Sequence, residues 1–193
     1  NTPSEIVTIG PSESMSKSKK NTIDPEGIIE NYGADSVRLF ILSDSPPEKD
    51  VQWSEQGMKA SYKFLQKLWL LHQKIKEKIN LKNTSNNQLN NISKFTNQLI
   101  DKVTNNLEKF HYNGIVANLY ETYNFMIKVI NQPLDHKDLL INYKKILYLM
   151  MPLVPHFASE CLEDLKITSK VEWPIADKKF LINKEIDMVI QIN

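Results

Sequence analysis

The sequence predicts a mainly α-helical protein: an antiparallel helix bundle preceded by a polar loop and two short helices. Apolar residues recur every three or four positions over several long segments, which is the spacing of one helix face. Glycine is scarce, with 5 in 193 residues, and Asn-rich polar segments separate the periodic ones. Helices that are joined by short loops pack antiparallel, so these patterns together favour a bundle.

Two short helices are expected near the start of the chain. The first begins at Asp24 and Pro25, because Asp is a preferred N-cap and Pro a preferred first helical residue. It ends near Gly33, since glycine is the usual residue just after a helix. The second helix, around residues 37–42, is apolar on nearly all sides and should therefore be buried.

The predicted bundle follows over residues 54–167. Its apolar stripes predict helices over residues 54–79, 92–110, 114–130, 139–150 and 155–165. The Asn-rich segment 80–91 has no periodicity and is expected to be a loop. Asn113 and Gly114 are expected to separate the second and third of these helices, and Pro152 should stop the fourth.

Short strands are predicted at both ends of the chain. Residues 5–9 alternate briefly before a Gly-Pro turn signal, and residues 186–192 are apolar at every second position. A lone strand at a terminus exposes an unpaired edge, so we expect the chain to be part of a longer protein.

Composition and charge restrict the functional classes. Lys and Arg total 24 against 23 Asp and Glu, so contact with nucleic acid must come from a local patch. The single cysteine, Cys161, excludes a disulfide framework and a Cys-rich zinc site. No apolar run approaches the ~20 residues that a membrane span needs, and the start has no signal-peptide pattern. We therefore expect a cytoplasmic protein without a membrane partner.

The most informative segment is residues 14–21, which we call the Ser/Lys loop; its sequence is Ser-Met-Ser-Lys-Ser-Lys-Lys-Asn. It places hydroxyl, backbone N–H and ammonium groups just ahead of the first predicted helix. Such a loop can wrap a polyphosphate, with the donors giving geometry and the lysines giving charge. The alternative interpretation is a solvated surface loop, because runs of charge are usually solvated.

The order of residues in the Ser/Lys loop resembles the K-M-S-K-S signature of class I aminoacyl-tRNA synthetases. Three later segments resemble the same class, and most closely its bacterial leucyl enzymes: Y-G-A-D-S-V-R at residues 32–38, L-S-D-S-P-P-E-K-D-V-Q-W-S at residues 42–54 and M-P-L-V-P-H-F-A at residues 151–158. Two other classes stay open: a non-catalytic helical RNA-binding module, and a synthetase for valine, isoleucine or methionine.

The resemblance implies a fragment of a leucine–tRNA ligase, which activates leucine with ATP and transfers it to tRNA(Leu). Residues 1–53 would end the catalytic domain, residues 54–167 would form the anticodon-binding domain, and residues 168–193 would lead into the C-terminal domain. The implied substrates are ATP with Mg²⁺, leucine and tRNA(Leu), and the implied enzyme is a monomer. The leucine pocket and the editing segment would lie elsewhere, so this fragment alone should be inactive and should bind no metal.

The resemblance also implies roles for single residues of the Ser/Lys loop. Lys17 would be catalytic, because it would neutralise the charge that develops on the leaving pyrophosphate. ATP would be bound by Met15, Ser16, Lys17 and Ser18. The two serines would either donate to phosphates or hold the shape of the loop. Ser14 departs from the signature, which has lysine at this position, and Lys19 or Lys20 is the candidate replacement for the missing ammonium group.

A few residues outside the loop have two interpretations. Arg38 should either pair with Asp35, three residues earlier on the same helix, or contact the tRNA backbone. The lysines of the first long helix should either contact phosphate or form a solvated face: Lys63, Lys67, Lys74, Lys76 and Lys78. His72 and Cys161 are expected in the core, and His156 is expected to be structural or solvent-facing.

Overall fold

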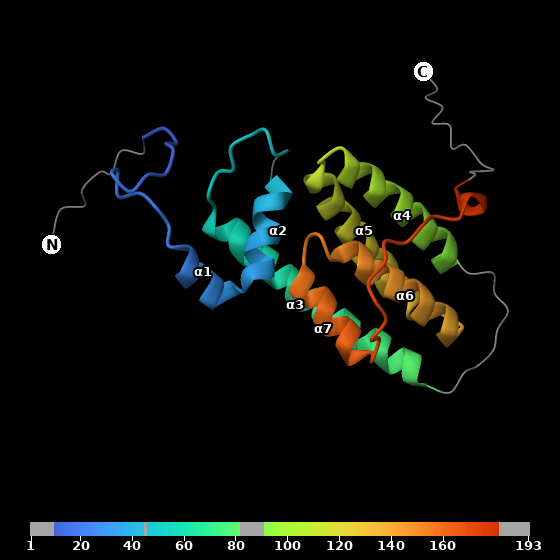
Figure 1. Cartoon of the computed structure of the whole chain (residues 1–193). Coiled ribbons are helices and arrows are strands. Elements are labelled where there is room, and N and C mark those ends of the chain that lie inside the picture. Colours follow the sequence, from blue (N-terminus) through green and yellow to red (C-terminus); the bar gives the residue numbers. More distant parts are fainter. Residues whose placement is uncertain (1–9, 45, 82–90, 182–193) are drawn as a thin grey trace, which may run out of the picture.

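The computed structural model of the chain describes residues 10–44, 46–81 and 91–181 (Figure 1). Its helices in chain order are α1 (Pro25–Tyr32), α2 (Ala34–Asp44), α3 (Glu55–Asn80), α4 (Asn91–Glu108), α5 (Tyr112–Val129), α6 (His136–Met150), α7 (Pro155–Asp164) and the 3-10 helix η1 (Lys178–Phe180). The mainly helical fold class is confirmed. The strands predicted over residues 5–9 and 186–192 lie outside the described residues.

The short helices α1 and α2 begin as the sequence predicts. The Asp24 carboxylate accepts a hydrogen bond from the Glu26 N–H at 3.1 Å, so it caps α1. Gly33 has a φ of 78° and alone turns the chain from α1 into α2, a conformation that glycine adopts without strain. The prediction that α2 is buried on nearly all sides is wrong, because Ile41 is 48% exposed, although Leu39 and Phe40 are buried.

The bundle is built on α3, which contacts α2, α5, α6 and α7, while α4 packs against α5 and α6 (Figure 1). Ser54 caps α3 by accepting a hydrogen bond from the Gly57 N–H at 3.1 Å. The core is continuous across these helices; its fully buried side chains include Ile75, Ile100, Ile115, Met126, Ile146 and Leu147. Among the described helices, none has both the length and the apolar character of a membrane span.

The break between α4 and α5 differs from the prediction. The chain turns at Phe110, which has a φ of 56° and is 60% exposed, although the apolar stripe had placed it in a helix. Gly114 lies inside α5, and a Cβ there would come within 3.0 Å of the Asn106 amide nitrogen. Glycine at this position therefore allows two helices to approach closely rather than ending one of them.

The predicted connector after α7 runs back over the bundle. The Trp173 indole N–H donates to Thr104 Oγ1 at 2.9 Å, and the Asp177 N–H donates to Asn97 Oδ1 at 2.8 Å. Both acceptors lie on α4. Side chains of α4 thus fix the path of the chain as it leaves the bundle.

Candidate functional site

The Ser/Lys loop is closed by the side chain of Asn21. Asn21 Oδ1 accepts the Ser16 N–H at 2.8 Å, and Asn21 Nδ2 donates to the Ser14 carbonyl at 3.3 Å. A turn lies inside this ring, where the Lys20 N–H donates to the Lys17 carbonyl at 3.2 Å. The sequence analysis missed this role of Asn21, although asparagine side chains commonly imitate backbone in turns.

The hydroxyl groups of the loop contact one another and the backbone. Ser16 Oγ lies 3.2 Å from Ser18 Oγ and accepts the Lys19 N–H at 3.3 Å. These contacts hold the shape of the loop, which is one of the two roles that the resemblance gave to the serines.

The three lysines of the loop have different electrostatic surroundings. Lys19 Nζ forms an ion pair with Glu13 Oε2 at 2.9 Å. Lys17 and Lys20 are exposed, and their ammonium groups form no ion pair with another described residue. Because Glu13 partly neutralises Lys19, the two other lysines carry the available positive charge of the loop.

A hollow of about 620 Å³ lies between the Ser/Lys loop and the segment that precedes α3. Its lining comes from two stretches of chain: Ser12, Glu13, Ser14 and Met15, and Asp50, Val51, Gln52 and Trp53. Gln52 Nε2 joins the two stretches by donating to Ser12 Oγ at 3.2 Å. Met15, which is 47% exposed, is thus the predicted ATP-binding residue that lines this hollow.

Arg38 and Asp35 do not form the expected ion pair with each other. Arg38 Nε and Nη2 instead donate to the carbonyl oxygens of Leu153 and Pro152, at 3.0 and 2.6 Å. Asp35 is buried and accepts two hydrogen bonds on the other side of the same turn. The donors are Phe157 N–H at 2.7 Å and His156 Nδ1 at 2.9 Å. We call these four bonds the α2 clamp, because both residues of α2 bind the turn between α6 and α7.

The exposed face of α3 carries a row of lysines, spaced so that they lie on one side of the helix. This lysine row consists of Lys59, Lys63, Lys67 and Lys74. Lys59 pairs with Glu55 at 2.6 Å, whereas the other three form no ion pair within the described parts of the chain. Lys78 is half-buried and sits at the edge of the row. The row is a local positive surface on a chain whose net charge is only +1.

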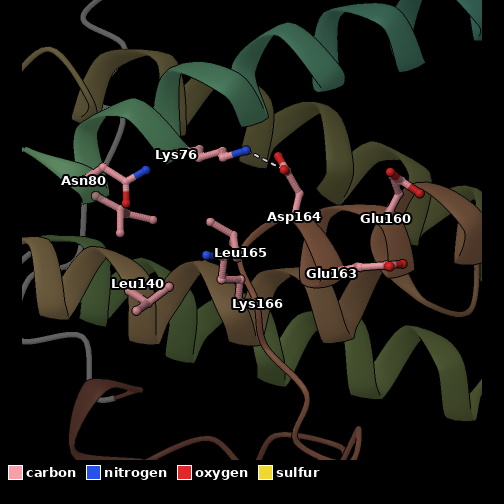
Figure 2. A pocket seen from close by; sticks show the side chains of 9 residues that line it. Lys76, Asn80, Leu140, Glu160, Glu163, Asp164, Leu165 and Lys166 are labelled. Atoms are coloured by element: carbon pink, nitrogen blue, oxygen red, sulfur yellow. Dashed lines mark hydrogen bonds and ion pairs between the residues drawn. The ribbon is translucent and has the colours of Figure 1, made fainter.

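Lys76 does not belong to the lysine row, contrary to the grouping in the sequence analysis. It reaches across from α3 to pair with Asp164 at the end of α7, beside a hollow of about 710 Å³ (Figure 2). Asp164 Oδ2 lies 3.0 Å from His72 Nε2, and His72 Nδ1 lies 3.0 Å from the Tyr143 hydroxyl.

Burial and these contacts shift the pKa values of His72 and Asp164. Burial lowers the pKa of His72, and hydrogen bonds from Lys76 and His72 lower the pKa of Asp164. His72 is fully buried, which confirms the expectation of a core residue, and exposed His156 accords with its expected structural role. The described residues include no group of His, Cys, Asp or Glu that could hold a metal ion.

Cys161 is expected to be unreactive toward a disulfide reagent in the folded chain. The side chain is fully buried, and this burial raises the pKa of the thiol to about 12. Roughly one thiol in ten thousand is then ionised at pH 8, and the thiolate is the reactive form. Ellman's reagent should therefore label the chain only after unfolding in guanidinium. Rapid labelling of the folded chain would contradict the burial of this thiol.

Two known families match separate parts of the chain. The family described as "Anticodon-binding domain of tRNA ligase" matches residues 90–193, and "tRNA synthetases class I (I, L, M and V)" matches residues 4–54. The first match covers more than half of the chain and includes helices α4 to α7.

Individual relatives agree with these matches. The chain is 36% identical to the leucine–tRNA ligase of Bartonella tribocorum over 97% of its own length, and 35% identical to that of Bradyrhizobium sp. strain BTAi1 over 98%. It spans only 22% and 23% of those proteins. Its fold is similar to part of the Agrobacterium radiobacter K84 agnB2 LeuRS, which was crystallised in a ternary complex with tRNA and LeuAMS. That similarity has a TM-score of 0.72 at 20% identity, and covers 87% of this chain and 23% of the other.

Proposed function

The chain belongs to the family of anticodon-binding domains of tRNA ligases, and from this premise we propose that it is part of a leucine–tRNA ligase. The observation that carries the proposal is the 36% identity to a leucine–tRNA ligase over 97% of the chain. The whole protein would be a monomeric cytoplasmic enzyme that uses ATP with Mg²⁺ to convert leucine into leucyl-adenylate. It would then transfer the leucyl group to tRNA(Leu).

In this reaction the Ser/Lys loop acts on ATP. The leucine carboxylate attacks the α-phosphate, and negative charge moves onto the leaving pyrophosphate. Lys17 is the proposed catalytic residue, because an ammonium group placed at this charge stabilises the transition state more than the ground state. Its freedom from ion pairs with other described residues leaves it available for this role. Met15, Ser16 and Ser18 would contact ATP beside it.

The contacts of the loop also bear on the missing signature lysine at Ser14. Lys19 is engaged by Glu13, so it is the poorer substitute. Lys20 carries an unpaired charge within the described chain, but it lies outside the signature positions, at the end of the turn and with a left-handed φ of 53°. We therefore propose that Lys17 supplies most of the positive charge that the loop offers to pyrophosphate.

The proposed function is tested by ATP–pyrophosphate exchange with the complete protein that contains this chain. Leucine should support exchange, whereas valine, isoleucine and methionine should support it far more weakly. Exchange with one of those three in place of leucine would assign the protein to another member of the class. Failure of all four amino acids to support exchange would contradict the enzyme assignment and favour a non-catalytic RNA-binding module.

Replacing Lys63, Lys67 and Lys74 together by glutamine is expected to weaken binding of tRNA(Leu) by the complete protein. Each phosphate contact releases counterions, so a plot of log affinity against log salt concentration slopes downward. Loss of one contact makes this slope shallower by about 0.7–0.9. Loss of three contacts should therefore reduce that slope by roughly two to three units between about 50 and 200 mM salt. Fluorescence anisotropy with labelled tRNA measures both quantities.

A second triple variant provides the matched control. Lys94, Lys128 and Lys137 are also exposed, but they lie on α4, α5 and α6 rather than on the lysine row. Changing them to glutamine removes the same net charge. If both variants lost affinity and slope equally, tRNA would be responding to net charge, and the lysine row would have no special role.

A further inference from the structure

We infer that Asp35 and Arg38 are positioning residues that couple the tRNA-bound bundle to the Ser/Lys loop. This inference rests on the proposed function, since it concerns how tRNA on the bundle acts with the loop that binds ATP. The carrying observation is the α2 clamp, in which two residues one helical turn apart bind both sides of the α6–α7 turn.

The clamp binds two carbonyl groups of the α6–α7 turn and one N–H group of the first turn of α7, which a helix leaves without an internal partner. Arg38 takes the carbonyl oxygens of residues 152 and 153, just beyond the end of α6. Asp35 takes the Phe157 N–H in the first turn of α7, whose own N-cap, Val154, makes no side-chain cap bond. A residue 122 positions away in the sequence thus supplies the N-terminal cap of α7.

The charge of Asp35 suits the helix end that it meets. The N-terminus of α7 carries partial positive charge and faces the Asp35 carboxylate, while the Arg38 guanidinium donates to two carbonyl groups of the turn that precedes α7. Hydrogen bonds with one charged partner are stronger and more directional than neutral ones. Burial of apolar surface between α2, α3 and α5 is non-directional, so it holds α2 in place without fixing its rotation. The clamp fixes that rotation.

The other side of α2 leads directly to the Ser/Lys loop. Gly33 alone separates α2 from α1, and only residues 22–23 separate the loop from Asp24, the cap of α1. Helix α1 also packs on α2 and α3. Because these connections are short, a change in the angle between α2 and the α6–α7 turn is transmitted to the Ser/Lys loop.

The test compares two reactions of the complete enzyme, each measured for Arg38→Ala and Asp35→Asn. Leucine-dependent pyrophosphate exchange without tRNA needs the loop but not the coupling, and it should stay within about twofold of the parent. The kcat for charging tRNA(Leu) needs both, and it should fall by roughly two- to thirtyfold, the range in which mutations along a coupling path act. The readout is the ratio of charging to exchange.

Two further variants make the ratio of charging to exchange decisive. His156→Ala removes only the bond made by an exposed side chain and leaves the Phe157 and Arg38 bonds in place, so its ratio should stay nearest to the parental one. Arg38→Lys should give an intermediate ratio, because an ammonium group lacks the planar fork that donates to both carbonyls. This variant replaces Arg38→Ala in the test if Arg38→Ala does not fold. Equal loss in both reactions, or loss in neither, would overturn the inference. Absence of leucine-dependent exchange in the parent enzyme would instead refute the proposed function.

Discussion

Replacing Lys17 by alanine in the complete enzyme is expected to slow leucine-dependent pyrophosphate exchange by about 10²–10³-fold, with a much smaller change in the KM for leucine. Loss of one preorganised donor to developing charge typically has an effect of this size, roughly 3–4 kcal/mol. The effect should lie in the upper part of that range, because Ser14 replaces the first signature lysine and Glu13 engages Lys19. Steady-state exchange at saturating ATP measures the change in kcat.

The neighbouring lysines provide controls of the same chemistry. Lys19→Ala should have little effect, because its ammonium group is already paired with Glu13, and Lys20→Ala should have a modest one. If Lys17→Ala stayed within a few-fold of the parent while Lys19→Ala or Lys20→Ala abolished exchange, the catalytic assignment would be wrong. The working lysine would then lie later in the loop, in compensation for Ser14.

The largest effect on stability is expected for Leu147→Ala. Leu147 lies on α6, where it is completely buried at the centre of the core cluster. Truncating a leucine in such a position removes buried apolar surface and leaves a cavity, which together destabilise a protein by about 2–5 kcal/mol. Urea unfolding of the 193-residue chain, followed by circular dichroism, measures this loss as a lower midpoint.

Ile141→Ala is the matched control on the same helix. Ile141 is 53% exposed, so its truncation should change the free energy of unfolding by less than about 0.5 kcal/mol. A loss for Ile141→Ala as large as that for Leu147→Ala would mean that α6 presents a different face to the core.

Local signals in the sequence predicted most helix boundaries because they act locally in the structure as well. Asp24 was predicted as a cap and its side chain bonds to the first turn of α1. Residue 54 was predicted as the start of a helix, and the Ser54 side chain bonds to the first turn of α3. The α4–α5 break was misplaced because glycine has two uses, as a breaker of helices and as a site of close approach. Only the distance from Gly114 to Asn106 distinguishes them.

The sequence predicted the part of the candidate site that lies within one short segment, and it did not predict the contacts between distant segments. The residue order of the Ser/Lys loop pointed to Lys17, but the closing role of Asn21 depends on side-chain geometry that the order does not specify. The spacing of three residues suggested a pair between Asp35 and Arg38, with a contact between Arg38 and the tRNA backbone as the alternative. Their actual partners lie more than a hundred positions away, and no periodic pattern connects segments over that separation.

The unbroken length of α3 gives the molecule a mechanical property. One end of this helix meets α1 and α2, and its 26 residues continue without interruption along the bundle. At a rise of 1.5 Å per residue it is a lever arm of about 39 Å, so each degree of tilt at one end displaces the other by roughly 0.7 Å. A rotation of about 5° would therefore carry the far end through roughly 3.4 Å, about the thickness of one stacked base. A small tilt of α3 at the end that meets α1 and α2 would thus be amplified at its distal end.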